Sequence, residues 1–268
     1  MNYSARMIPF TKASACGNDF LIVEGAAAST DLAALTQRMC NRHNGVGADG
    51  VEWVFPDAEA NARILLFNAD GSEAEISGNG TRCVAAYLHS RQAKPELTIR
   101  TAAGVKTCRL VRHQGATFEF ETAMGRPEVL GTASIPIASA AFSGAVEGMK
   151  VSTGNPHFVM FVESFPADWR ERAADIQRQP QFPQGTNVEY VAVRGANEIE
   201  IRLYERGVGE TQSSGTGSCA SAVAAIAAKR AASPVRVVAP GGAQRVRWED
   251  EVFLLGPATL VCRGEFFV

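Results

Sequence analysis

The sequence has no stretch of about 20 apolar residues, which a membrane-spanning helix would need. Its first ten residues, MNYSARMIPF, also lack the apolar run of a secretory signal. An excess of charge of one sign is missing too, because 26 basic and 28 acidic residues give a net charge of −2. These absences give no reason to expect a membrane or a nucleic acid as a partner, and they predict a cytoplasmic protein.

Cysteine and histidine are too scattered to indicate a metal site. The six cysteines and four histidines form no C-x-x-C pair and no cluster with zinc-ligand spacing. We therefore expect neither a structural metal nor a disulfide framework, and we interpret the cysteines as reduced, mostly buried thiols. Apolar residues still make up 46% of the 268 residues, which is enough for the core of one large domain or of two ordinary ones.

Short apolar segments separated by Gly, Asn and Asp dominate the chain. Their β-branched and aromatic residues predict strands at residues 20–25, 50–55, 63–68, 96–100, 117–122, 157–162, 188–193 and 198–205. Helices are expected at 30–43, with Thr30 or Asp31 as the N-cap, and at 81–92 and 218–232. The last two are rich in alanine, which suits helices enclosed by other elements better than surface helices.

The chain contains an internal repeat. Residues 68–86 match residues 205–223 when Ser77 is aligned with Ser214, which sets an offset of 137 residues. At the same offset and without gaps, Gly17-Asn18 falls on Gly154-Asn155, and residues 51–54 fall on 188–191. Three separated matches at one offset favour the duplication of a domain of about 130 residues.

The repeat predicts where the two lobes begin and end. The M-G-R-P stretch at 124–127 has the composition of a turn and marks the boundary. We expect an N-terminal lobe at 1–125, completed by 259–268, and a C-terminal lobe at 126–258.

Two matching turns, S-G-N-G (77–80) and S-G-T-G (214–217), each come directly before a predicted helix. Glycines let backbone N–H groups approach a ligand, and a helix start offers unpaired donors and a positive dipole end, so such a turn suits a carboxylate or a phosphate. Two of them predict one small-molecule site between the lobes. The alternative is a pair of ordinary capped turns, because serine is a favoured N-cap.

The first residue of each turn is the natural place for a reactive group. Two such groups on opposite faces of one carbon suit stereoinversion, in which one removes the α-proton and the other delivers a proton to the opposite face.

A set of ordered motifs resembles the diaminopimelate epimerase family. They are A-C-G-N-D-F (15–20), F-N-A-D-G-S-E (67–73), S-G-N-G-T-R-C (77–83), G-N-P-H (154–157) and Y-E-R-G-V-G-E-T-Q-S-S-G-T-G-S-C (204–219). The resemblance covers nearly the whole chain. It implies an α+β fold of two pseudo-symmetric lobes from an internal duplication, each a β-barrel-like sheet around a central helix.

The resemblance also implies a function. Such an isomerase inverts LL- to meso-diaminopimelate by two-base proton transfer at Cα, without pyridoxal phosphate, metal or another cofactor, in lysine and peptidoglycan biosynthesis. The expected partner is this amino acid, and the family analogy allows a homodimer.

Motif by motif, the resemblance assigns roles to individual residues. Ser77 and Ser214 occupy the positions of the acid–base pair, and His157 and Glu205 match positions that tune its pKa. The residues that match substrate-binding positions are Asn18, Asn68, Gly78, Asn79, Asn155, Asn187, Glu205, Arg206, Gly215 and Thr216. Of these, Glu205-Arg206 match the pair that receives the distal ammonium and carboxylate of the substrate.

The chain departs from the family pattern at the acid–base pair. The family has cysteine at both positions, whereas this chain has Ser77 and Ser214. A thiol ionises near neutral pH at a helix start, but the pKa of a serine hydroxyl is several units higher. Serine must therefore be assisted, and His157 and Glu205 are the candidates. Cys83 and Cys219 lie further along the helices and are not expected to replace the missing thiols.

Two further interpretations stay open at this point. The chain could be a catalytically weak or inactive amino-acid-binding homologue, or a version of an active enzyme in which both cysteines were replaced by serine. It could also be a racemase or isomerase of the same fold with another substrate. Glu205-Arg206 argue against the last interpretation, because a substrate with a charged distal end needs such a pair.

Overall fold

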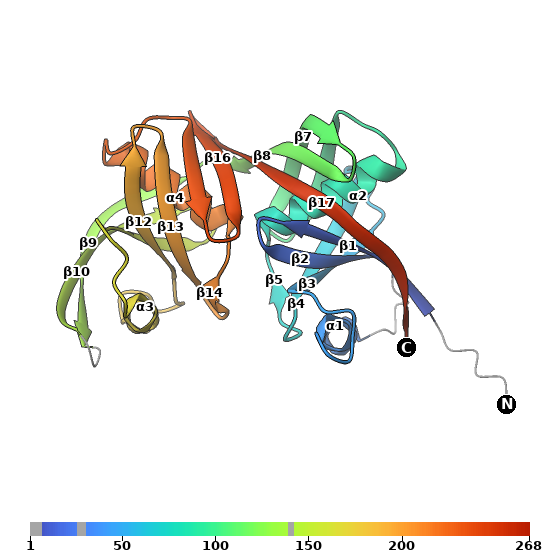
Figure 1. Ribbon diagram of the computed structural model, residues 1–268, viewed down its shortest axis with the longest axis horizontal. Helices are drawn as coiled ribbons and strands as arrows, with labels where there is room; N and C mark the ends of the chain where they lie inside the picture. The colour runs from blue at the N-terminus through green and yellow to red at the C-terminus, as the bar shows by residue number, and fades with distance from the viewer. Residues whose placement is uncertain (1–6, 26–30, 139–141) are drawn as a thin grey trace. The chain divides into compact units, whose positions relative to one another are not determined.

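The computed structural model describes residues 7–25, 31–138 and 142–268. The chain divides into two compact units, which are unit 1 (Met1–Thr122 with Gly256–Val268) and unit 2 (Ala123–Leu255). The first elements of the chain are β1 (Met7–Ala15), β2 (Asn18–Glu24), α1 (Leu32–Cys40), β3 (Gly50–Phe55), β4 (Ala62–Asn68), β5 (Glu73–Ala74), α2 (Gly78–Arg91), β6 (Glu96–Thr101), β7 (Gly104–Gln114) and β8 (Thr117–Gly125) (Figure 1). They are followed by β9 (Glu128–Ala138), β10 (Ser143–Ser152), β11 (Pro156–Phe161), α3 (Trp169–Gln177), β12 (Asn187–Gly195), β13 (Glu198–Glu205), β14 (Gly209–Thr211), α4 (Gly215–Ala227), β15 (Val235–Ala239), β16 (Gly242–Trp248) and β17 (Val252–Phe267).

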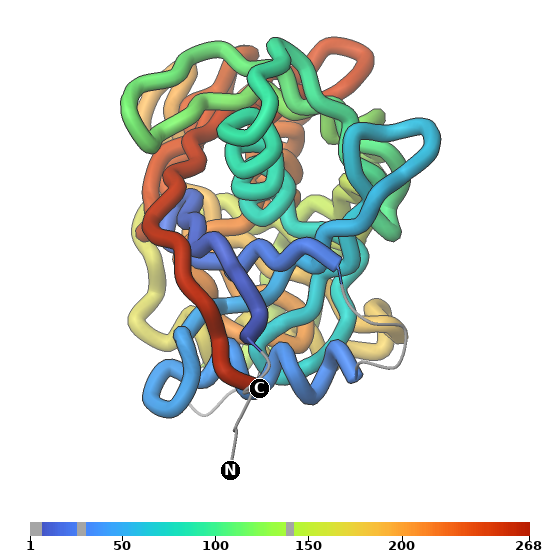
Figure 2. The backbone as a smooth tube through the Cα atoms, turned by 90° about the vertical axis from the view of Figure 1, so that its right-hand side faces the viewer, coloured from blue at the N-terminus to red at the C-terminus, as the bar shows by residue number. Residues whose placement is uncertain are grey.

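Unit 1 is a closed barrel of eight strands. The strands pair in the order β8, β7, β6, β4, β3, β2, β1 and β17, and β17 pairs again with β8. The β2–β3 and β4–β6 pairs are parallel, whereas β1–β17, β1–β2, β3–β4, β6–β7 and β7–β8 are antiparallel. Figure 2 shows β17 running beside β1, which brings the end of the chain back to its beginning.

Helix α2 lies in the core of this barrel. Residues 78–87 are all buried, and Cys83, Val84, Ala85, Ala86 and Tyr87 pack in one cluster with apolar side chains from the surrounding strands. The small side chains of the helix allow this enclosure, because a sheet closed around a helix leaves little space between the two. The expectation that this alanine-rich helix is enclosed is confirmed.

Unit 2 has the same internal layout. Its strands pair in the order β9, β10, β11, β12, β13, β15, β16 and β17, and residues 215–225 of α4 are buried in a cluster with them. Helices α1 and α3 lie 137 residues apart at both ends, and the parallel pairs Phe20↔Gly50 and His157↔Asn187 keep the same offset. The fold is α+β, as expected, and the duplication stays a prediction about its origin.

The predicted strands are all present, but the helices differ from the prediction in two ways. Helices α2 and α4 begin at Gly78 and Gly215, three residues before the predicted starts, because the preceding serines cap them and the glycines already have helical geometry. Helix α3 is missing from the prediction. Asp31 caps α1 by accepting from the Ala34 N–H at 3.0 Å, whereas Thr30 lies outside the described residues.

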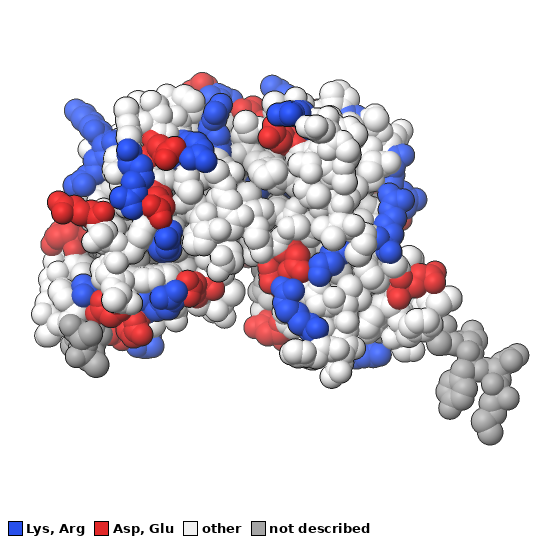
Figure 3. Space-filling model, in the orientation of Figure 1, with Lys and Arg blue, Asp and Glu red and all other residues white. Residues whose placement is uncertain are grey.

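The distribution of charge on the surface and the length of the apolar helices agree with what the composition predicts. Figure 3 shows basic and acidic side chains interspersed on the visible face of each unit, without a broad area of one sign. Within the residues that the structure describes, no helix combines the length and apolarity needed to cross a membrane.

Candidate active site

In unit 1, Ser77 is the N-cap of α2. Its side-chain oxygen accepts from the Gly80 N–H at 3.0 Å, and its carbonyl accepts from the Thr81 N–H at 2.8 Å. Ser77 remains partly exposed, whereas the three residues after it are buried. The hydroxyl therefore stands at the positive end of a helix dipole and stays accessible to a small molecule.

Asparagines and one arginine hold this turn in place. The Asn79 side-chain amide donates to Asn18 Oδ1 at 2.7 Å, and the Asn18 amide donates to Asp49 at 3.1 Å. The fully buried Arg82 donates to the Gly78 carbonyl at 3.1 Å and also to Asn79 Oδ1. The structure thus brings together Asn18, Gly78 and Asn79 around Ser77.

Asn68, the remaining predicted residue of unit 1, is held within the β4–β5 turn. Its side-chain amide donates to Ser72 Oγ at 3.0 Å, and its backbone N–H donates to the Ser72 carbonyl at 2.8 Å. These bonds close the turn, and the next residue, Ala69, donates its N–H to the Asp49 carbonyl at 2.9 Å.

In unit 2, Ser214 caps α4 in the same way. Its side-chain oxygen accepts from the Gly217 N–H at 3.2 Å, and its carbonyl accepts from the Ser218 N–H at 2.9 Å. The Thr216 hydroxyl lies 3.4 Å from the Ser214 hydroxyl. Ser214 is 6% exposed and counts as buried, whereas Ser77 is only partly buried, so the turn at Ser214 is the more enclosed of the two.

A buried histidine–glutamate pair lies beneath this second turn. His157 Nδ1 is 2.7 Å from Glu189 Oε1, and His157 Nε2 is 2.9 Å from Asn155 Oδ1. Both ring nitrogens face oxygens, so a protonated ring donates to both. Burial raises the pKa of Glu189, and His157 opposes this rise. The Asn155 amide is 3.5 Å from the Thr216 hydroxyl, which links the pair to the turn.

Glu205 and Arg206 lie at the end of β13 and directly after it. Burial raises the pKa of the Glu205 carboxyl, and the hydroxyls of Thr211 and Ser214 oppose this rise. The Asn187 side chain accepts from the Arg206 N–H at 2.9 Å and fixes the backbone there. The Arg206 guanidinium donates to the Gln184 carbonyl at 3.0 Å.

The cysteines cannot replace the serines at these turns. Cys83 and Cys219 are fully buried inside the helices, and burial raises the pKa of the Cys83 thiol well above its usual range. Of the six free cysteines only Cys262 is exposed. Among the described residues, no group of three or more Cys, His, Asp and Glu could hold a metal ion.

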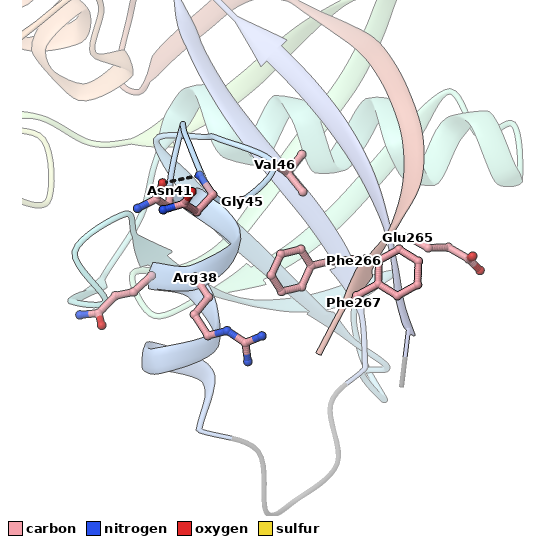
Figure 4. Close-up of a pocket in the computed structure, with 9 residues that line it drawn as sticks. Arg38, Asn41, Gly45, Val46, Glu265, Phe266 and Phe267 are labelled. Atoms are coloured by element: carbon pink, nitrogen blue, oxygen red, sulfur yellow. Dashed lines mark hydrogen bonds between the residues drawn. The ribbon is translucent and has the colours of Figure 1, made fainter. Parts of the chain in front are cut away.

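A hollow of about 650 Å³ lies away from these residues, in unit 1. Figure 4 shows Arg38, Asn41, Gly45 and Val46 on one side of it and Glu265, Phe266 and Phe267 on the other. The Arg38 guanidinium lies 5.6 Å from the centre of the Phe266 ring, a cation–π distance. None of the predicted site residues lines this hollow.

Sequence reasoning missed two buried glutamates, Glu52 and Glu189. Each is the third residue of its strand, and its carboxyl faces the helix glycine that comes three residues after the capping serine. A signal was available, because a single acidic residue interrupts the apolar runs GVEWVF (50–55) and VEYVAV (188–193), and the two fall on each other in the repeat. The repeat drew attention to the lobes and to the glycine turns, and the paired glutamates were not assigned a role.

Comparisons with known sequences point to one family. The profile of the family described as diaminopimelate epimerase matches residues 10–130 and 149–261. A protein of that name from Desulforudis audaxviator is 40% identical over 277 residues, which cover 96% of this chain and 98% of the relative. Another from Halothermothrix orenii is 37% identical and covers 97% and 98%, respectively.

Solved structures share the fold at lower identity. A hydroxyproline epimerase from Agrobacterium vitis has a TM-score of 0.77 at 16% identity, over 100% of this chain and 94% of that chain. A phenazine biosynthesis protein of the PhzF family from Bacillus anthracis has a TM-score of 0.74 at 16% identity, over 98% and 100%. At this identity the likeness shows a common fold and leaves the substrate open.

Proposed function

Since the chain belongs to the diaminopimelate epimerase family, we propose that it inverts one stereocentre of diaminopimelate, between the LL and meso forms, in lysine and peptidoglycan biosynthesis. The observation that carries this proposal is the pair of serine-capped helix starts, each with a buried acid–base group beneath it. An isomerase that removes a proton on one face and returns one on the other needs two such groups.

The proposed reaction starts with a helix terminus holding a carboxylate. The N–H groups at the start of a helix are unpaired, and the dipole favours negative charge there. A substrate α-carboxylate bound by these donors becomes more able to stabilise the carbanion that forms when Cα loses its proton. We assign this role to the backbone of Gly78, Asn79, Gly215 and Thr216.

Ser77 and Ser214 are then the proton-transferring groups. One oxygen accepts the α-proton while the other donates a proton to the opposite face, so the configuration inverts. Neither hydroxyl is a strong base by itself, and each therefore depends on its buried neighbours. In unit 2 these are His157, Glu189 and Glu205, whose charges act on one another and on the Ser214 hydroxyl.

Specificity for a second charged end is assigned to Glu205 and Arg206. They are an acidic and a basic residue adjacent in the chain at the end of β13, and the distal carbon of diaminopimelate carries an ammonium and a carboxylate. Proline and 4-hydroxyproline lack the distal amino acid centre and should not use this pair.

Solvent exchange tests the proposal directly. The protein is incubated in D₂O with LL-diaminopimelate, meso-diaminopimelate or proline, and incorporation at Cα is measured by mass spectrometry. Both diaminopimelates should exchange and proline should not. The Ser77→Cys/Ser214→Cys variant should exchange about 10²–10⁴-fold faster, because thiols ionise far more readily than hydroxyls in general acid–base catalysis.

Other outcomes would separate the competing interpretations. Binding of diaminopimelate without exchange, in both the serine protein and the cysteine variant, would indicate an amino-acid-binding homologue. Exchange of proline but not of diaminopimelate would leave the isomerase chemistry in place and contradict the substrate.

A further inference from the structure

Glu52 is a buried carboxyl with no visible purpose in the fold. Its side chain is 0% exposed, and neither carboxyl oxygen has a hydrogen-bond partner among the described residues. A charged carboxyl buried without partners strongly destabilises a fold unless the group becomes neutral. Burial accordingly raises the pKa of Glu52 to about 8. A leucine would fill the same strand position of β3 without this cost.

The carboxyl of Glu52 is aimed at the start of α2. A side-chain carbon placed on Gly80 would overlap Glu52 Oε1 and would lie 3.2 Å from the Ser77 Cβ. Glu52 and Ser77 therefore approach the same point, and the missing side chain of Gly80 leaves the space between them open. The Gly80 N–H occupies one lone pair of the Ser77 oxygen, which leaves the hydroxyl proton available for donation.

Among the described residues, no charged group is found to act on Glu52, whose pKa is raised by burial alone. Besides burial, the pKa of Cys83 on α2 responds to Arg82 and Glu52, and also to Cys16 and Asp19. Arg82 directs its guanidinium to the Gly78 and Pro257 carbonyls and to Asn79. The counterpart of Glu52 in unit 2, Glu189, does have a partner in His157.

We propose that Glu52 is the proton-relay partner of Ser77, a positioning residue that exchanges a proton with the serine hydroxyl during epimerisation; this inference rests on the proposed function. When the Cα–H bond breaks, its electron pair stays on Cα and its proton bonds to the Ser77 oxygen. The original hydroxyl proton of Ser77 passes to a carboxylate oxygen of Glu52. The negative charge thus moves from Glu52 to the substrate, and Ser77 ends as it began.

The reverse step uses the same groups. A protonated Glu52 returns its proton to Ser77 as Ser77 protonates the carbanion. The relay needs no oxidant, reductant or additional reactant. It also gives the buried carboxyl a reason to be able to lose and regain a proton close to the working pH.

An introduced thiol tests the coupling without any reference to activity. In Ser77→Cys/Cys262→Ser protein, which lacks the exposed cysteine, the rate of alkylation by iodoacetamide is followed from pH 6 to pH 10. Adding Glu52→Gln should make the introduced thiol about tenfold more reactive at pH 8, because it removes a charge that opposes the thiolate. Glu52→Leu, which suits a buried site, should have the same effect and guards against misfolding of the first variant.

The matched control places the thiol in the other unit. In Ser214→Cys/Cys262→Ser protein, Glu52→Gln should leave the alkylation profile unchanged. An unchanged profile in the Ser77→Cys protein, or an equal change in both, would overturn the coupling between Glu52 and Ser77.

The exchange assay then tests the relay itself. In the serine protein, kcat/KM for diaminopimelate should rise with pH along an acidic limb whose midpoint lies near pH 8. Glu52→Gln should remove this limb and slow exchange about 10- to 100-fold. Glu189→Gln should retain the limb. A retained limb in Glu52→Gln would overturn the relay. If the unaltered protein exchanges no diaminopimelate, the proposed function fails, and the thiol experiment still decides the coupling.

Discussion

The two serine-capped turns share a backbone plan but differ in what lies beneath them. Under Ser214, Glu189 is paired with His157 at 2.7 Å. Under Ser77, Glu52 occupies the matching strand position, but Phe20 stands at the register position where unit 2 has His157. One half-site therefore contains a paired acid and base, and the other contains an unpaired acid.

This difference suits a reaction that needs two groups in opposite protonation states. A proton is removed on one face only if that group is a base, and one is delivered on the other only if that group is an acid. If the two serines had identical surroundings, their acid–base groups would share one pKa. Neither group would then be favoured as the base or as the acid. Unequal surroundings push the pKa values of equivalent groups apart, as they do in other enzymes with paired acids.

The largest expected effect comes from replacing His157 by phenylalanine, the residue that unit 1 has at the matching position, Phe20. His157→Phe removes one member of a buried pair and leaves Glu189 unpartnered, so the free energy of unfolding at pH 7 should fall by about 3–5 kcal/mol. The loss should shrink at lower pH, because a protonated Glu189 no longer needs the imidazole. Urea unfolding measured at pH 5 and pH 7 checks both statements.

A rescue and a reciprocal change make this comparison sharper. Adding Glu189→Gln should restore part of the stability lost in His157→Phe, since it removes the buried charge. Phe20→His in unit 1 should cost less than His157→Phe, because the new imidazole gains Glu52 as a partner. Equal losses without rescue would mean that packing, and not charge, distinguishes the two half-sites.

How much of this was predictable depends on the kind of signal. The strands and the enclosed helices follow from alternation and from small side chains, and the motifs located Ser77, Ser214 and their neighbours. The start of α2 was predicted late, because glycines are poor helix formers in isolation, and the serine cap entered only as the alternative to a ligand-binding turn. Here tertiary packing decides the matter, since only glycine fits beside Glu52.

The partners of the buried glutamates were not predictable from local pattern. Glu52 and Glu189 look alike in sequence, and their difference comes from residues about 30 positions away that pair with their strands in parallel. His157 was recognised through its motif, but Glu189, which orients it, was not. For Asn68 the motif predicts a ligand role, which stays a prediction, and the structure adds that its side chain donates to Ser72 within the β4–β5 turn.

The pH dependence of stability gives a second test. The folded pKa of Glu52, about 8, lies above its ordinary value of 4.5, so the native state holds a proton that the unfolded state releases between these values. The contribution of Glu52 to stability is full below pH 4.5 and is lost as the pH rises to 8, by at most about 1.4 kcal/mol per unit.

Glu52→Gln should flatten this decline, as measured by urea unfolding at one-unit steps from pH 5 to pH 9. Part of the slope should remain, because burial raises the pKa of Glu189 and Glu205 in the same direction. An unchanged slope would mean that Glu52 is ionised throughout this range in the folded protein.

The smallest expected effect concerns the turn glycines and can change sign. Gly80→Ala gains about 1 kcal/mol of helix propensity but overlaps Glu52, so the net effect should be a loss of about 1–2 kcal/mol. In a Glu52→Ala background the overlap disappears, and the same change should become stabilising.

The matched change in unit 2 is Gly217→Ala. The new side-chain carbon would lie 2.6 Å from Leu203 Cδ2 and 3.0 Å from Glu189 Oε1. Glu189→Ala removes only the second contact, so Gly217→Ala should stay destabilising in that background. Each coupling is measured by thermal unfolding of four proteins, which are the unaltered protein, the glycine variant, the glutamate variant and the double variant. Sign reversal in unit 1 alone would place the unpaired carboxyl against the Ser77 turn, whereas reversal in both or in neither would make the half-sites equivalent in their packing.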